Sequence, residues 1–118
     1  LFAADSALLS ESHFRAVGWS SNDIPIAMAS MSHTAEFPKL MRQNADPAVV
    51  VDSGIVEEDV RRVARELVQR EPETRAIVIE CTNLVPYAFA LQLETGLPVF
   101  DIVTLTKMAN DAVSRARF

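Results

Sequence analysis

The chain has 118 residues, a hydrophobic content of 49% and a formal net charge of −5. This length supports one hydrophobic core of ordinary size, so we expect one domain. The acids are dispersed and no basic cluster occurs, which argues against nucleic acid or a membrane surface as the partner. The sequence holds one cysteine and no apolar run of about 18 residues, which favours a cytoplasmic protein.

The first third of the chain predicts a strand, a helix and a second strand. Residues 1–4 read like the end of a strand that begins upstream, so we expect a piece of a longer protein. Residues 6–18 have apolar groups at helical spacing, with Ser10 as a cap and Gly18 as a stop. Residues 24–28 predict the second strand, and a loop should follow it.

The middle of the chain predicts two helices. Residues 36–41 favour a short helix with Pro38 in its first turn, and residues 48–52 favour a strand or an extended connection. From Ser53 the valines recur at three- and four-residue steps, which is typical of an amphipathic helix. The acids of residues 57–59 are expected in its first turn, where they complement the helix dipole.

The last third repeats the alternation of strand and helix. We expect a strand at residues 76–79, buried on both faces, then a helix at 86–95 that ends at Gly96. A strand at residues 97–100 and a final amphipathic helix should follow. Such alternation with short connections predicts an α/β fold, a parallel sheet flanked by helices, with residues 1–118 forming a single α/β domain.

Cys81 is the strongest candidate for a functional residue. It follows the predicted strand at 76–79 directly and precedes a helix that has Pro86 near its start. In open α/β sheets ligands collect at the carboxyl ends of the strands, and a helix start favours anions, including a thiolate. The competing interpretation is that an unpaired cysteine only packs in the core. The polar neighbours Thr82 and Asn83 favour function.

Two motifs resemble the aspartate/glutamate/hydantoin racemase superfamily. Residues 80–88 read ECTNLVPYA and residues 95–105 read TGLPVFDIVTL. The Cys-Thr pair followed by a proline is the specific part, and weaker upstream similarity extends the resemblance over nearly the whole chain. The resemblance is to the carboxyl-terminal domain of that family.

The resemblance implies one of two pseudo-symmetric domains, the carboxyl-terminal portion of a protein whose amino-terminal half is absent. It implies a cofactor-independent racemase or isomerase of a small carboxylate, with one cysteine from each domain in the cleft. Cys81 would be a thiol acid/base, and Thr82 and Asn83 would bind the substrate carboxylate. The 118-residue piece alone should be inactive. We expect no metal, no cofactor and a homodimer, because an uncovered domain face encourages self-association.

Some features keep other functions open. Asn83 stands where glutamate racemases have a histidine, which argues against glutamate as the substrate. Similar proteins isomerise maleate or decarboxylate aryl-malonates. The alternatives are therefore a one-thiol decarboxylase, a carboxylate-binding domain without turnover, or a thiol redox sensor.

Five other polar or aromatic residues have simpler interpretations. Glu80 is expected to be a structural acid or an ion-pair partner, and Asp101 a helix cap more than a cleft residue. Tyr87 is expected to pack. His13 and His33 are expected at the surface or in a loop, since two isolated histidines and one cysteine do not have the spacing of a metal site.

Overall fold

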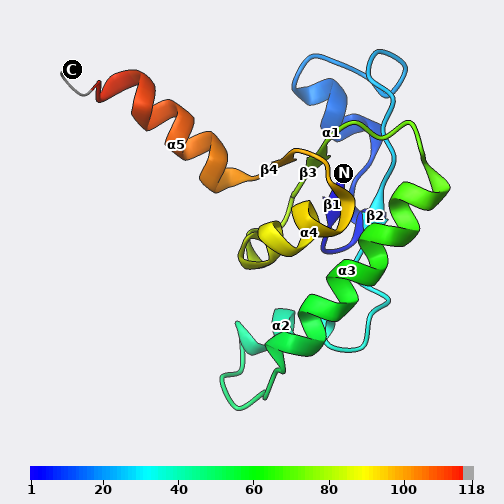
Figure 1. Cartoon of the computed structure of the whole chain (residues 1–118), viewed down its shortest axis with the longest axis vertical. Coiled ribbons are helices and arrows are strands. Elements are labelled where there is room, and N and C mark those ends of the chain that lie inside the picture. The colour runs from blue at the N-terminus through cyan, green and yellow to red at the C-terminus, as the bar shows by residue number, and fades with distance from the viewer. Residues whose placement is uncertain (116–118) are drawn as a thin grey trace.

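The computed structural model describes residues 1–115, along which short strands alternate with helices (Figure 1). The mixed α/β class is confirmed, although each strand is only two residues long. The elements in chain order are β1 (Phe2–Ala3), η1 (Ser6–Leu8), α1 (Glu11–Ala16), β2 (Ala29–Ser30), α2 (Phe37–Gln43), α3 (Ser53–Arg70), β3 (Ile77–Val78), η2 (Thr82–Tyr87), α4 (Ala88–Thr95), β4 (Val99–Phe100) and α5 (Ile102–Val113), where η marks a 3₁₀ helix.

The strands are parallel, as predicted. β1 pairs with β2 and β3 pairs with β4, and a bridge between Phe2 and Ile79 joins the two pairs. The resulting spatial order is β2-β1-β3-β4. The backbone N–H of Glu80 donates to the carbonyl of Phe2 at 3.0 Å, which holds the two central strands together just beyond the end of β3.

The core lies on one face of this sheet, where α3 and α4 pack side by side. Ile77 and Ile79 point into the core, whereas Val78 between them is 48% exposed. The expectation that this strand is buried on both faces is therefore wrong, because Val78 lines an open cavity whose other walls include Phe14 of α1 and Trp19. The largest fully buried side chains are Phe2, Met31, Phe37, Val56, Val60, Leu67, Ile77, Leu84 and Leu91.

Helix α3 is the best-predicted element. It begins directly after Asp52, whose carboxylate accepts from the N–H groups of Gly54 and Ile55 at 2.9 and 3.2 Å. Its apolar stripe is buried, as the periodicity predicted. The acids of residues 57–59 lie in the second turn, so their assignment to the first turn is wrong.

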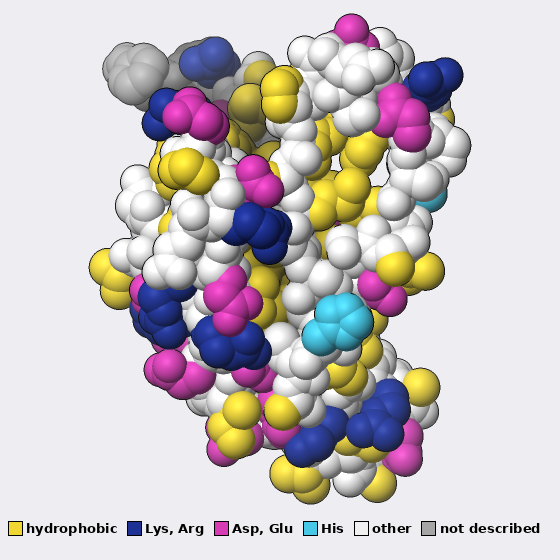
Figure 2. All heavy atoms as spheres, turned by 90° about the vertical axis from the view of Figure 1, so that its right-hand side faces the viewer, with side chains coloured by type: hydrophobic (Ala, Val, Ile, Leu, Met, Phe, Trp, Pro, Cys, Tyr) yellow, Lys and Arg dark blue, Asp and Glu magenta, His cyan; other side chains and the backbone are white. Residues whose placement is uncertain are grey.

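The acids of α3 form ion pairs instead. Glu57 lies 2.7 Å from Arg61, and Asp59 lies 3.0 Å from Arg62. Arg65 reaches Glu94 at 2.8 Å and so links α3 to α4, and this contact lowers the pKa of the Glu94 carboxyl below its ordinary value. Figure 2 shows the resulting interleaving of basic and acidic side chains on this side of the molecule.

Two predicted strands are wrong or misplaced. Residues 24–28 form no ladder, and β2 begins at Ala29, directly after the predicted range. Pro25 explains part of this difference, since proline has no N–H to donate. Residues 48–52 form an extended connection, which was the alternative interpretation.

The predicted ends of the helices agree with the structure better than the predicted ends of the strands. Ser10 caps α1 in a capping box with His13, but the helix is shorter than predicted, and η1 occupies the first part of the segment. Helix α2 is short and has its proline near the start. Gly96 ends α4 with φ +67°, a left-handed conformation that suits glycine.

No helix among residues 1–115 is long and apolar enough to cross a membrane.

Candidate functional site

The direction of the chain connections reverses between β1 and β3. From β1 the chain leaves toward β2 on one side, and from β3 it leaves toward β4 on the other. Where successive connections diverge in this way, the carboxyl ends of the two strands leave an open crevice that commonly binds ligands. Residues 4–6 follow β1 and residues 79–83 follow β3, so both segments lie at the end of the sheet where such a site forms.

Cys81 lies at this edge, as predicted. It is the residue before η2, with extended backbone angles of φ −91° and ψ 127°. Its thiol is free and half-buried, and its side chain packs against the edge of the core. The helix begins at Thr82, four residues before Pro86, so the thiol lies at a helix start and not in a longer turn.

Thr82 and Asn83 lie in the first turn of η2. Thr82 is exposed, and its hydroxyl makes no hydrogen bond to another side chain among residues 1–115. The Asn83 amide donates to the sulfur of Met41 on α2 at 3.2 Å, a weak acceptor that a better one can replace. Cys81, Thr82 and Asn83 therefore lie together at the carboxyl end of β3. The side chains of Thr82 and Asn83 are available for polar contacts.

Two acids follow the central and outer strands. Glu80 is exposed, and it forms no ion pair within residues 1–115. Asp101 caps α5: its carboxylate accepts from the N–H of Thr104 at 2.7 Å, and Thr104 accepts in return from the N–H of Asp101 at 2.8 Å. The cap interpretation of Asp101 is confirmed, whereas Glu80 does not form the expected ion pair among residues 1–115.

Tyr87 packs against the core, as predicted. Burial raises the pKa of its hydroxyl, and the charge of Glu57 adds to the effect. The half-buried position of Tyr87 against the core is that of a structural residue.

A polar hollow of 310 Å³ at the end of β2 was missed by sequence reasoning. It lies between the loop after β2 and α3, and His33, Arg62 and Arg70 contribute to its lining. Ser6 donates its N–H to the hydroxyl of Ser30 at 3.2 Å, which joins the ends of β1 and β2 there. The signal in the sequence was the polar run directly after β2, which was interpreted as a plain loop.

The two arginines of this hollow already have partners. Arg62 contacts Asp59 and Glu66 at 3.0 and 3.1 Å, which raises the pKa of its guanidinium. Arg70 donates to the carbonyl of Met28 at 2.8 Å. Glu71 lies 3.4 Å from Arg70 as well, so both arginines have acidic partners and the hollow does not form an anion site by charge alone.

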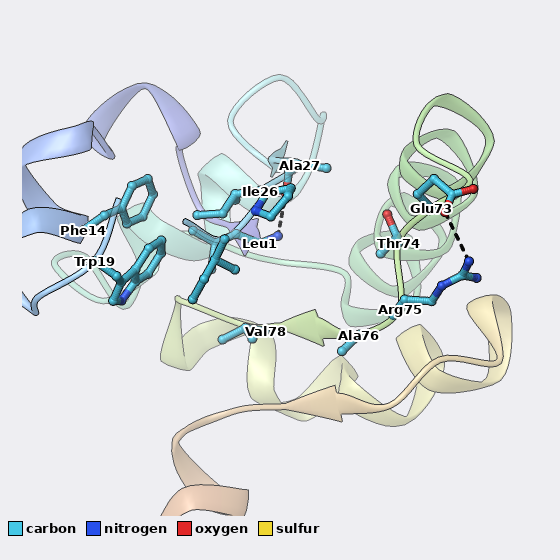
Figure 3. A pocket seen from close by; sticks show the side chains of 12 residues that line it. Leu1, Phe14, Trp19, Ile26, Ala27, Glu73, Thr74, Arg75, Ala76 and Val78 are labelled. Atoms are coloured by element: carbon cyan, nitrogen blue, oxygen red, sulfur yellow. Dashed lines mark hydrogen bonds and ion pairs between the residues drawn. The ribbon is translucent and has the colours of Figure 1, made fainter. Parts of the chain in front are cut away.

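A larger cavity of 560 Å³ lies on the side of the sheet to which Val78 points (Figure 3). Phe14 and Trp19 stack on one side of it with ring centroids 4.6 Å apart, and Val78 lies opposite. None of Cys81, Thr82 and Asn83 lines it. Because its walls are mostly apolar, the cavity suits apolar side chains more than a charged small molecule.

Neither histidine has metal-site geometry. His13 accepts from the N–H of Ser10 at 3.1 Å, and His33 lies in the exposed loop after β2. Among residues 1–115, no group of three or more histidine, cysteine or acidic side chains lies close enough to hold a metal ion.

Segments of this chain are similar to segments of proteins that are named as lyases. The chain is 37% identical over 62 residues to dimethylsulfoniopropionate lyase 5 of Emiliania huxleyi and 43% identical over 58 residues to dimethylsulfoniopropionate lyase 7 of the same alga. It is 38% identical over 42 residues to the dimethylsulfoniopropionate lyase of Durusdinium sp. clade D. These segments cover 52%, 46% and 36% of this chain and 12%, 17% and 14% of the relatives.

No family model matches the chain, and no solved structure matches it.

These relatives correct the predicted family and activity. They are named as lyases, not as racemases, so the assignment to the racemase superfamily and the isomerase function are wrong, and these names give no support to a cysteine acid/base mechanism. The names give no support to the decarboxylase alternative either. The placement of Cys81, Thr82 and Asn83 in a substrate site does not depend on the racemase assignment and stays a prediction.

Proposed function

We propose that this chain is one α/β domain of a longer lyase that cleaves dimethylsulfoniopropionate or a closely related sulfonium carboxylate. The observation that carries the proposal is the 37–43% identity to three proteins of that name. The matched segments are a minor part of those relatives. The proposed activity therefore belongs to the whole protein, and this chain supplies one portion of the active site.

The substrate determines what the site must do. Its carboxylate and its sulfonium group lie at opposite ends of a two-carbon chain. Cleavage removes a proton from the carbon next to the carboxylate; the C–H electron pair forms a double bond, and the C–S bond breaks with its electron pair on sulfur. The products are dimethyl sulfide, an acrylate and a protonated base. Such a site needs polar donors at one end and a negative charge at the other.

The edge beyond β3 offers both kinds of group. We assign the Thr82 hydroxyl and the Asn83 amide to the substrate carboxylate, since both are donors with no strong acceptor in this structure. The free carboxylate of Glu80 supplies a negative charge for the sulfonium end. Cys81, between them in sequence and half-buried, is the catalytic residue we place against the carbon chain.

We also propose a class of partner and a cellular compartment for the protein. The partner is a small carboxylate, consistent with the net charge of −5 and its dispersed acids. The compartment is a reducing cytoplasm, which suits a free thiol.

Binding to this chain can be tested by NMR. Dimethylsulfoniopropionate is titrated into the labelled chain, and propionate, which lacks the sulfonium group, serves as the control ligand. We expect saturable amide shifts confined to residues 79–84, larger with the sulfonium compound. Shifts that are absent, or that spread over the surface without saturation, would contradict the site.

Turnover is tested in the full-length protein that carries this chain. Dimethyl sulfide release is measured by gas chromatography for the wild type, for Cys81→Ala and for Val17→Ala, a control at an exposed position in the turn after α1. We expect Cys81→Ala to lose at least about 100-fold in rate and the control to keep the wild-type rate. Release of dimethyl sulfide at the same rate by all three proteins would remove Cys81 from the mechanism.

A further inference from the structure

The side chain of Met41 on α2 contacts the amide of Asn83, which the proposed function assigns to the substrate carboxylate. The amide nitrogen lies 3.2 Å from the Met41 sulfur, although the two residues are 42 positions apart in the sequence. Within residues 1–115 the Asn83 side chain makes no other hydrogen bond. The orientation of this amide therefore depends on a residue of a different helix.

Both residues lie on short helices that buried side chains hold in place. On α2, Phe37 is 1% exposed, and Leu40 packs against the core. On η2, Leu84 follows Asn83 directly and has no exposed surface. The packing of the two helices therefore sets the contact between Met41 and Asn83, so it is more than a chance meeting of two mobile surface side chains.

Hydrogen bonds also fix the two ends of α2. At its start, the Glu36 carboxylate accepts from the N–H of Asp52 at 3.0 Å. In its last turn, the Gln43 amide donates to the carbonyl of Val49 at 2.8 Å. Both bonds join α2 to the segment that leads into α3. A substitution at Met41 that keeps the volume of the side chain should therefore leave the position of α2 unchanged.

The chemistry of the contact leaves part of the Asn83 amide free. A thioether sulfur is a weak acceptor and has no hydrogen to donate, so the amide nitrogen faces it and the amide oxygen does not. The amide NH₂ group carries two hydrogens, and the sulfur accepts one of them. The second hydrogen points away from the sulfur. A carboxylate can accept it in a hydrogen bond that its negative charge strengthens.

We propose that Met41 is a positioning residue for the carboxylate-binding amide of Asn83. By accepting one N–H, the sulfur fixes the rotation of the amide and presents the second N–H to the substrate. The inference rests on the proposed function, and it adds α2 to the elements that build the site. Because the substrate carboxylate is bound both before and during cleavage, Met41 should affect the binding of substrate and not the rate at which bound substrate reacts.

Binding of dimethylsulfoniopropionate to the chain is the first test. Met41→Leu keeps a similar volume and removes the acceptor, so it should weaken the Kd by about 3- to 10-fold, as expected for one lost hydrogen bond. Met41→Gln restores an acceptor and should stay within about twofold of the wild type. Met108→Leu, the same change at a 64% exposed position on α5, is the control and should leave the Kd unchanged.

A double-mutant cycle tests whether Met41 acts through Asn83. In an Asn83→Ala background, Met41→Leu should weaken binding no further, because the amide on which it acts is gone. In the full-length protein, Met41→Leu should raise the KM for dimethyl sulfide release by the same factor as the Kd and leave kcat within about twofold. Equal weakening of binding by Met41→Leu in both backgrounds, or a loss in kcat alone, would overturn the proposal.

NMR of the chain without ligand separates a failure of this inference from a failure of the proposed function. The Asn83 amide signals are assigned by their loss in Asn83→Ala, and Met41→Leu should shift the proton that faces the sulfur. Amide signals that Met41→Leu leaves unchanged would overturn the positioning role. A shifted amide together with no ligand binding by the wild type or any variant would instead overturn the proposed function, and the role of Met41 in a carboxylate site with it.

Discussion

Helices α3 and α5 have similar sequence patterns and opposite environments. Both are amphipathic, and both follow a capping aspartate, Asp52 for α3 and Asp101 for α5. The stripe of α3 is buried against the sheet, whereas no residue of α5 is buried. Periodicity therefore predicts a helix and its apolar side. Only the tertiary structure shows whether that side packs against another part of the chain.

The largest difference between the two helices should appear in the free energy of unfolding when a leucine of each is replaced by alanine. Leu67 on α3 is 1% exposed and Leu105 on α5 is 54% exposed. Leu67→Ala should lower the free energy of unfolding by about 2–5 kcal/mol, because it leaves a cavity. Leu105→Ala, measured by urea denaturation at a concentration where the chain is monomeric, should change it by less than about 0.5 kcal/mol. Equal effects would mean that α5 packs on its own chain.

Removal of the capping aspartate should also destabilise the fold more at α3 than at α5, but the difference should be smaller than for the leucines. Asp52→Ala removes the acceptor for two N–H groups of α3 and should cost about 0.5–2 kcal/mol of global stability. Asp101→Ala should instead fray α5 and reduce the helical signal in circular dichroism, with a smaller change in the unfolding midpoint. If Asp101→Ala destabilised the fold as much as Asp52→Ala, helix α5 would be coupled to the core.

The smallest effect should be the pH dependence at the start of α3. Glu36 accepts from Lys39 at 2.7 Å and from the N–H of Asp52 at 3.0 Å, and these contacts lower the pKa of its carboxyl. A lowered pKa means that the stabilisation is present above the ordinary pKa of glutamate, about 4.3, and is lost as the pH falls through the lower folded value. Thermal unfolding between pH 7 and pH 3 should therefore show a steeper loss for the wild type than for Glu36→Gln. Parallel curves would exclude a contribution from Glu36.

The sequence predicted the helices better than the strands, for a physical reason. The stripe and cap of α3 are local features, and so are the left-handed stop at Gly96 and the cap at Asp101. The strands depend on ladder partners far along the chain: β2 is set by pairing with β1, not by the apolar run at residues 24–28. The exposure of Val78 was likewise not visible locally, because a run of β-branched residues is the same in a strand covered on one face or on two.

The candidate site was predicted in its position but not in its chemistry. The strand-to-helix step at Cys81 is a local pattern, and the structure places that residue at the sheet edge. The polar hollow beside His33 could not be predicted, because it forms where β1 pairs with β2 and the sequence does not show that pairing. The activity depended on family resemblance, and the short motif around Cys81 did not separate a racemase from a lyase.

The most direct test of the proposed site is the rate at which Cys81 is alkylated with and without dimethylsulfoniopropionate. Cys81 is the only cysteine, so mass spectrometry of the whole chain reports on it alone. We predict that alkylation proceeds in the folded chain, that dimethylsulfoniopropionate slows it saturably, and that propionate slows it less. An alkylation rate that neither compound changes would contradict a sulfonium carboxylate site at the end of β3.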